Sequence, residues 1–272
     1  MSDGRPSLLI KRARSSTENG ANEPIITPEQ GSIVGPLEDN ETLEPYRFEG
    51  DNLPHRSHVF LKKRDGNLIG IRKVARRTNA GNILNDTVSE LKLYRKIISH
   101  PGWDSYVLPF AGGATLKDYV YIDFDYVKGN TLYDYMSTKP SRKHIYGILA
   151  DVARALAFLT RIRIIHGDIK PDNIWIKPHG SRAPSAVLFD FGNGTDSPSD
   201  ATRWEDLIDY MDTCVHILAG KTGLPSIDPD TVDYSTIYNT FAEFWETQIS
   251  VAKGGSRRRR RHTRHAHTRR RR

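Results

Sequence analysis

Residues 166–173 read His-Gly-Asp-Ile-Lys-Pro-Asp-Asn, and residues 190–192 read Asp-Phe-Gly. The first stretch puts a carboxylate, an ammonium group and an amide at fixed spacing, and the second adds another carboxylate soon after. Asp and Asn also favour turns, so Asp168 and Asn173 have an alternative role as turn or cap residues. Both stretches adjoin apolar, strand-like segments, which favours an organised site beside two strands over a simple polar loop.

In order and spacing, these stretches resemble the catalytic loop and the metal-binding loop of the protein kinase superfamily, in its serine/threonine form. The resemblance implies ATP-dependent phosphoryl transfer to Ser or Thr hydroxyls of a protein substrate, with ATP and Mg²⁺ as cofactors. It also implies residue roles. Asp168 would orient the substrate hydroxyl, Lys170 would contact the transferring phosphate, and Asn173 and Asp190 would hold Mg²⁺.

One position in the first stretch departs from the family pattern. Gly167 stands where many regulated kinases carry an arginine that pairs with a phosphorylated activation loop. The resemblance therefore argues against that form of control, and it also relates the loop to the His-Gly-Asp of small-molecule phosphotransferases. The Lys-Pro pair at 170–171 favours the serine/threonine protein kinases instead.

Composition divides the 272 residues into a foldable middle and two polar ends. Residues 1–45 are rich in Ser, Glu, Asn, Gly and Pro and are predicted to be disordered, as is an Arg-rich tail over 251–272. The resemblance implies a kinase-like α+β domain over residues 46–250. Its upper lobe (about 46–127) would hold a small antiparallel sheet, and its helical lower lobe (about 128–250) would be truncated at the C-terminal side.

A β-hairpin is predicted in the upper lobe, because residues 59–63 and 68–74 flank an Asp-Gly turn. In the second strand Ile71 and Lys73 share a face, since side chains alternate along a strand. The resemblance implies that Ile71 packs against adenine and that Lys73 binds the α- and β-phosphates. An ordinary solvated lysine is the alternative.

Glu90 is the expected partner of Lys73. Residues 87–98 predict a helix, and the family places its lysine-binding glutamate on such a helix at a comparable distance. Thr87 and Glu90 also fit a capping box, in which Glu90 would bind the start of its own helix. The ion pair is the favoured interpretation, and the two roles largely exclude each other.

The resemblance also bears on two further parts of a nucleotide site, the hinge and the glycine-rich phosphate loop. Residues 119–124 predict a strand that leads into a hinge. There Phe124 would be the gatekeeper, and the backbones of Asp125 and Val127 would face the adenine edge. Residues 46–58 contain a single glycine where the family pattern has three, so the glycine-rich phosphate loop is missing.

The lower lobe is expected to be short. Apolar spacing predicts a helix over 145–159 and another over 204–219. The second helix resembles the family helix whose N-terminal aspartate braces the catalytic-loop backbone, which implies that role for Asp206 or, alternatively, Asp209. An acid that merely favours the start of its own helix is the other interpretation. Only 13 residues separate Gly192 from Asp206, and they hold no Ala-Pro-Glu-like sequence. The pattern therefore predicts intact cleft chemistry without the usual peptide-docking platform.

Positive charge is concentrated at the C-terminus. Residues 253–272 carry Lys253 and ten arginines without an acid, and removing these eleven charges from the +7 of the chain leaves −4. Such a tail suits phosphate backbones without base specificity, and it also resembles a nuclear localisation signal. Besides the protein substrate, the expected partner is nucleic acid or a nuclear import receptor, and an inert tail is the alternative.

The rest of the sequence narrows location and class. The single cysteine, Cys214, fits a reducing compartment, and no stretch is apolar enough for a membrane span or a signal peptide. The nucleus or cytoplasm is expected, and the protein resembles reduced kinases of large DNA viruses. A small-molecule phosphotransferase and a non-catalytic pseudokinase with a nucleic-acid-binding tail remain alternatives. The sequence predicts neither the substrate nor the oligomeric state.

Overall fold

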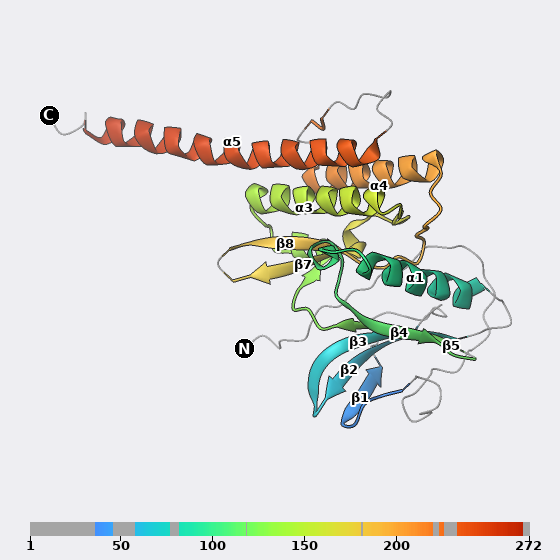
Figure 1. The fold of residues 1–272 in the computed structure, drawn as a ribbon. Helices are drawn as coiled ribbons and strands as arrows, with labels where there is room; N and C mark the ends of the chain where they lie inside the picture. The colour runs from blue at the N-terminus through green and yellow to red at the C-terminus, as the bar shows by residue number, and fades with distance from the viewer. Residues whose placement is uncertain are drawn as a thin grey trace, which may run out of the picture.

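The computed structural model describes residues 36–45, 58–76, 82–117, 119–180, 182–219, 223–225 and 233–268. One part is an antiparallel sheet of order β1-β2-β3-β5-β4, with helix α1 (Asn82–Ile98) against it (Figure 1). Its strands are β1 (Glu41–Pro45), β2 (His58–Arg64), β3 (Asn67–Arg76), β4 (Phe110–Thr115) and β5 (Tyr119–Asp125).

The predicted hairpin is confirmed by β2 and β3. Asp65 and Gly66 form its turn with φ angles of 50° and 78°, the left-handed pair that a tight two-residue hairpin requires. Strand β3 is then central, since it also pairs with β5. The alternation of side chains along β3 turns Ile71 and Lys73 toward the lower part of the molecule.

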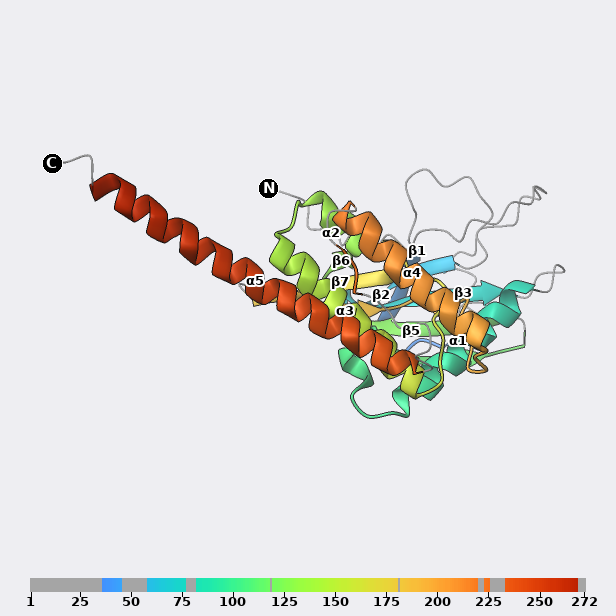
Figure 2. The same ribbon diagram turned by 90° about the horizontal axis from the view of Figure 1, so that it is seen from above.

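The second part contains a small antiparallel sheet and most of the helices. The sheet, of order β6-β7-β8, comprises β6 (Asn130–Thr131), β7 (Ile174–His179) and β8 (Arg182–Leu188). Helix α3 (Arg142–Arg161) packs between β8 and α5 (Tyr234–Thr268). Helix α4 (Asp200–Leu218) lies alongside, and α5 extends well beyond the other elements (Figures 1 and 2). Helix α2 (Leu132–Ser137) and two short 3-10 turns, Trp103–Ser105 and Pro171–Asn173, complete the described elements.

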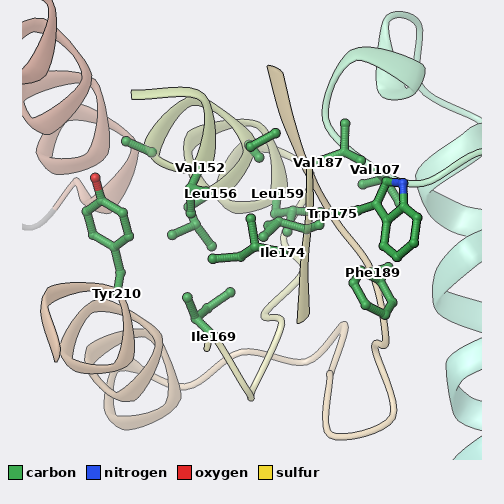
Figure 3. Close-up of a cluster of buried hydrophobic side chains, with 14 of the residues drawn as sticks. Val107, Val152, Leu156, Leu159, Ile169, Ile174, Trp175, Val187, Phe189 and Tyr210 are labelled. Atoms are coloured by element: carbon green, nitrogen blue, oxygen red, sulfur yellow. The ribbon is translucent and has the colours of Figure 1, made fainter. Parts of the chain in front are cut away.

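The core of the lower part is built around β7 and α3. Buried side chains from several elements meet there, and Figure 3 shows Trp175 and Phe189 side by side at one end of this cluster and Tyr210 at the other. Trp245 of α5 is buried, and its Nε1 donates to the Tyr210 hydroxyl at 2.9 Å. That hydroxyl in turn donates to the Leu149 carbonyl at 3.0 Å, so one polar chain links α5, α4 and α3.

The described elements extend beyond the predicted domain, 46–250, at both ends. Strand β1 precedes residue 46, because it pairs with β2 and buries Leu43 with Phe60. Glu41 is also buried there, and although burial opposes its charge, Lys62 and Arg64 hold its pKa at about 2. At the other end α5 is helical through Thr268, whereas disorder was predicted from residue 251. Packing anchors α5 near Trp245, and arginine has a high helix propensity.

The other parts of the two predicted disordered ends, residues 1–35 and 269–272, lie outside the described residues. Within the described ranges no helix combines the length and the apolar character needed to cross a membrane.

Candidate active site

Lys73 lies between two carboxylates at the junction of the two parts. Its Nζ is 2.7 Å from Glu90 Oε2 on α1 and 3.0 Å from Asp190 Oδ1, just after β8. Glu90 is 1% exposed, and the side chain of Lys73 is 13% exposed. The ion pair predicted between Lys73 and Glu90 is therefore present, with Asp190 as a third member.

One ammonium group shared by two acids explains the direction of each pKa. Burial alone would lower the pKa of Lys73, but Asp190 and Glu90 raise it above its ordinary value. Burial raises the pKa of Glu90, which Lys73 only partly opposes, while Lys73 outweighs burial at Asp190 and lowers its pKa. The three groups carry a formal net charge of −1 when ionised, which favours a further cation beside Asp190.

The capping-box alternative for Glu90 is wrong. Helix α1 begins at Asn82, so Thr87 lies inside the helix and cannot be its N-cap. Four residues after Glu90, and hence on the same helix face, Tyr94 accepts a hydrogen bond from the Asp190 N–H at 3.2 Å. Its ring also packs edge-on against Phe191, with 5.2 Å between centroids. Helix α1 thus contacts the Asp-Phe-Gly stretch directly through Tyr94, which the sequence did not reveal, and is linked to it a second time through the Glu90–Lys73–Asp190 ion pairs.

The catalytic-loop residues form a second set of contacts. Asn173 is fully buried on the 3-10 turn, and its Nδ2 donates to the Asp168 carbonyl at 2.8 Å and to Asp168 Oδ2 at 2.9 Å. Lys170 Nζ pairs with the same carboxylate oxygen. Asn173 Oδ1 is buried and has no hydrogen-bond partner among the described residues. Asp168, Lys170 and Asn173 therefore lie together, as predicted, with one amide oxygen still free to bind a ligand.

Asp190 has a φ of 64°, an uncommon left-handed conformation for a residue other than glycine. The contacts on both sides hold it there. Phe191 is fully buried and packs on His166, whose ring lies 4.6 Å away, while His166 Nε2 donates to the Phe189 carbonyl at 3.0 Å. The two sequence stretches are thus locked together by direct contacts, and backbone strain of this kind is typical of functional sites.

Helix α4 supports the catalytic loop from behind. The backbone N–H groups of His166 and Gly167 donate to the two carboxylate oxygens of Asp206, at 2.8 and 2.7 Å. The predicted brace is therefore confirmed as Asp206. Asp209 is half-buried nearby, and burial together with the Asp206 and Asp168 carboxylates raises its pKa to about 6.

Gly167 is required by the path of the segment that follows the metal-binding loop. Its φ is 77°, and a Cβ at this position would lie 2.3 Å from the Asn193 carbonyl oxygen. Ile165 and Thr195 exchange two backbone hydrogen bonds, of 2.9 and 3.1 Å, that hold the two segments together. An arginine at position 167 would not fit this arrangement, because its Cβ would clash with the Asn193 backbone.

An apolar pocket adjoins Lys73 and is enclosed by both parts of the molecule. Asp125 and Val127 of the predicted hinge line it, and so does Ile71. The Asp125 N–H already donates to the Pro109 carbonyl at 3.0 Å. The full lining is Ile71, Lys73, Leu108, Phe124, Asp125, Val127, Trp175 and Phe189. We call the groups around Lys73, Glu90, Asp190, Asp168, Lys170 and Asn173 the charged end of the cleft, and this pocket its apolar end.

The sequence did not assign two features of this cleft. Trp175 and Phe189 were recognised only as strand residues, because strand periodicity says nothing about a neighbouring pocket. Arg72, the neighbour of Lys73 on β3, is the other basic side chain at this point of the strand. Its side chain instead points to the other face of β3, where it is 2% exposed and binds Asp123 with two hydrogen bonds of 2.6 Å. Residues 46–57, which include most of the expected phosphate loop, lie outside the described residues.

Residues 56–215 match the family model described as the protein kinase domain. This match covers more than half of the chain, and the chain therefore belongs to the protein kinase domain family. Family members use ATP and Mg²⁺.

Individual relatives are distant. The chain is 33% identical to the serine/threonine-protein kinase DCLK1 of Rattus norvegicus over 78 residues. This aligned stretch covers 28% of the chain and 18% of DCLK1. It is 28% identical to the serine/threonine-protein kinase cst-1 of Caenorhabditis briggsae over 203 residues. This aligned stretch covers 72% of the chain and 36% of cst-1. The chain thus spans well under half the length of these two relatives.

A solved kinase domain matches with a TM-score of 0.52 at 15% identity, over 72% of this chain and 69% of that one. This likeness confirms the kinase-like α+β fold. The expected viral origin stays a prediction.

The charged end fits a metal-bound phosphate group. Carboxylate and amide oxygens suit Mg²⁺, which is commonly held by one or two protein groups together with phosphates and water. Asp190 and the unpartnered Asn173 Oδ1 supply such oxygens, and Lys73 supplies a nearby cation. The apolar end is narrow, since the cavity that its described residues line has a volume of about 30 Å³.

Proposed function

We propose that the chain transfers a phosphoryl group from ATP, with Mg²⁺, to Ser or Thr hydroxyls of a protein substrate. The observation that supports this most directly is the charged end. There Asp168 contacts Lys170 and Asn173, and Lys73 contacts Glu90 and Asp190. Family membership adds the reaction type, because phosphoryl transfer depends on positioning and charge neutralisation by such groups.

Each residue has a separate part in this proposal. Asp168 orients the acceptor hydroxyl and takes up its proton, and Lys170, beside it, neutralises charge on the transferring group. Asn173 and Asp190 would hold Mg²⁺ through their oxygens, and Lys73, kept in place by Glu90, would hold the phosphates. The bound Mg-ATP supplies the phosphoryl group and further neutralisation of charge.

The choice of a protein acceptor rests on the serine/threonine kinases among the relatives and on the Lys-Pro pair at 170–171. A small-molecule acceptor is the second candidate. One observation favours it: the segment between Asp190 and the start of α4 at Asp200 is short and leaves little surface for a bound peptide. A pseudokinase without transfer is the third, favoured by the small cavity at the apolar end.

Labelling with ATP that carries a radioactive γ-phosphate separates these candidates. The chain is incubated with Mg²⁺ and either a mixed protein extract or a panel of small hydroxyl compounds. We expect labelled Ser and Thr in protein, and at least a hundredfold lower rate for Asp168→Asn and Asp190→Asn. Asp65→Asn, on the exposed hairpin turn, is the matched control and should keep the wild-type rate.

The outcomes are distinct. Labelling of small molecules alone would favour the second candidate. Thermal stabilisation by Mg-ATP without any labelling above Asp168→Asn would favour the pseudokinase and contradict the proposed enzyme.

We further propose that the arginine-rich end of the chain binds nucleic acid in the nucleus. Residues 253–272 carry eleven positive charges, and phosphate contacts of this kind depend strongly on salt. Removal of residues 253–272 should abolish salt-dependent binding of a fluorescent DNA duplex and reduce nuclear accumulation of a tagged chain. Unchanged DNA affinity and location in the truncated chain would contradict this part. Unchanged affinity with lost nuclear accumulation would indicate an import receptor as the partner.

A further inference from the structure

Trp175 occupies the apolar end of the cleft. It lies on β7, directly after Ile174, and only 2% of it is exposed. Its indole packs edge-on against Phe189, with 6.0 Å between ring centroids, at the end of the core cluster (Figure 3). Both rings line the pocket beside Lys73 and Ile71. The pocket wall on the lower side is therefore formed by two large aromatic side chains.

Backbone on the hinge side fixes the position of the indole. A Cβ on Gly129 would lie 2.5 Å from Trp175 Nε1 and 2.2 Å from the Ile176 carbonyl oxygen. Glycine at 129 therefore lets the hinge backbone lie close to β7 and to the indole of Trp175. The indole thus lies between the Gly129 backbone and the Phe189 ring, and the close backbone at Gly129 blocks its movement in that one direction.

The space that remains is too small for a nucleotide base. The cavity of about 30 Å³ has room for about two water molecules. Sites that hold small organic ligands measure roughly 300 to 1,000 Å³. A purine ring can therefore enter only if a lining side chain moves, and Trp175 is the largest of them.

The indole also carries an unsatisfied polar atom. Trp175 Nε1 is buried and has no hydrogen-bond partner among the described residues. Buried donors are almost always paired, because an unpaired donor has lost its hydrogen bond to water. In the described rotamer the indole of Trp175 packs well against apolar side chains, but its N–H has no hydrogen bond. The missing hydrogen bond lowers the energy that a change of rotamer requires.

From these contacts we propose that Trp175 is the residue that limits nucleotide binding in this chain. The indole must turn out of the apolar end before a base can bind, so the measured affinity is the intrinsic affinity reduced by the fraction of molecules with the pocket open. This inference rests on the proposed function, since it takes the apolar end as the base pocket of that site.

Adenosine tests this without phosphates, metal or turnover. Its affinity is measured by titration calorimetry for the wild type, for Trp175→Leu and for Trp204→Leu. The last is the matched control, since Trp204 is 47% exposed on α4, away from the pocket. We expect Trp175→Leu to bind adenosine at least tenfold more tightly and Trp204→Leu to match the wild type. Equal or weaker binding by Trp175→Leu would overturn the proposal, because the indole would then be neutral or a favourable stacking surface.

A second measurement uses the wild-type side chain and covers the case in which Trp175→Leu does not fold. The four tryptophans are replaced by 5-fluorotryptophan, and the ¹⁹F signal of Trp175 is assigned by its loss in Trp175→Phe. Saturating adenosine should shift this signal by more than those of the other three. An unshifted Trp175 signal at saturation would overturn the proposal.

Failure of this inference and failure of the proposed function are distinguishable. A chain that labels protein but shows no gain of adenosine affinity in Trp175→Leu keeps the function and loses the inference. A chain that labels nothing yet gains affinity in Trp175→Leu keeps Trp175 as the obstruction in a pocket that is not used for catalysis.

Discussion

The two ends of the cleft differ in the interactions that hold their side chains in place. At the charged end, ion pairs join side chains from β3, α1 and the metal-binding loop, and further contacts join those of the catalytic loop. Asn173 Oδ1 has no hydrogen-bond partner among the described residues, and the charge around Asp190 is net negative, so both favour binding of a cation. At the apolar end Trp175 and Phe189 pack as in a protein core and leave a small cavity. The groups that suit phosphoryl transfer thus lie together, whereas the neighbouring cavity is narrow.

This difference shows that chemistry and affinity depend on separate residues here. The charged end is fixed by ion pairs and by backbone contacts to Asp206, which do not depend on what occupies the pocket. At the apolar end, by contrast, the proposed movement of one side chain, Trp175, would change the volume of the cavity. A weak nucleotide affinity would therefore not by itself mean that the catalytic groups are lost.

The largest effect is expected from Lys73→Met, which leaves the buried Glu90 and the partly buried Asp190 without their cation. Breaking a buried ion pair costs about 3 kcal/mol, so the free energy of unfolding measured by urea denaturation should fall by about that amount. Lys63→Met, which removes an exposed pair with Glu44, is the control and should change it by less than about 1 kcal/mol.

The double variant Lys73→Met, Glu90→Gln sharpens this test. It removes one of the two uncompensated acids and should recover part of the lost stability without restoring transfer. No loss of stability in Lys73→Met would mean that the charged end is less tightly built than its contacts indicate.

A smaller effect is expected from Gly167→Ala, which tests whether the catalytic loop and the segment at Asn193 are rigidly packed. Gly66 is the matched control, since its φ of 78° is nearly the same but a Cβ there would meet nothing within 4 Å. Both variants are destabilised because alanine is strained in the left-handed conformation. In Gly167→Ala the Cβ also clashes with the Asn193 carbonyl oxygen. Gly167→Ala should lose about 1 to 3 kcal/mol more than Gly66→Ala in thermal and urea unfolding. Equal losses would show that the two segments separate easily.

Tyr210→Phe tests the support that α5 and α4 give to the charged end. It leaves Trp245 Nε1 without an acceptor and removes the hydroxyl that donates to the Leu149 carbonyl in addition to that carbonyl's helical bond, so about 1 to 2 kcal/mol of stability should be lost. Tyr238→Phe is the matched control, because the buried Tyr238 hydroxyl has no partner among the described residues. It should lose little or even gain stability. If the two variants behaved alike, the polar chain from α5 to α3 would not contribute.

The smallest effect concerns pH and Asp209. Its folded-state pKa of about 6 lies above the value near 4 of an unfolded chain, so the folded state binds this proton more tightly. The stabilisation is complete below pH 4 and is lost as the pH rises through about 6. Asp209→Asn should therefore flatten the decrease of unfolding free energy between pH 4 and pH 6, while Asp65→Asn should not. An unchanged slope in Asp209→Asn would show that Asp209 is effectively solvated.

Much of the charged end could be predicted from the sequence because its residues fall on short, fixed spacings. Positions 168, 170 and 173 share one loop, and the alternation of β3 selects Lys73 over Arg72, which binds Asp123 on the opposite face. Glu90 was ambiguous only until the start of α1 was known. These assignments rest on local geometry, which a sequence carries well.

The rest depends on packing between distant segments. Strand β1 is short and holds one core residue, Leu43, so composition alone placed it with the disordered end. The extension of α5 was missed because a run of arginines is polar whether or not it is helical. Trp175 was recognised as a strand residue, but its place in the pocket depends on Gly129, 46 positions earlier in the chain.

The central claim is that an intact charged end works behind a restricted apolar end. Initial rates of labelling with γ-labelled ATP, at ATP concentrations below saturation, test it directly for the wild type, Trp175→Leu and the double variant Trp175→Leu, Asp168→Asn. The account predicts that Trp175→Leu labels protein faster than the wild type and that the added Asp168→Asn abolishes this labelling. Absence of labelling by both the wild type and Trp175→Leu, or labelling that persists in the double variant, would contradict it.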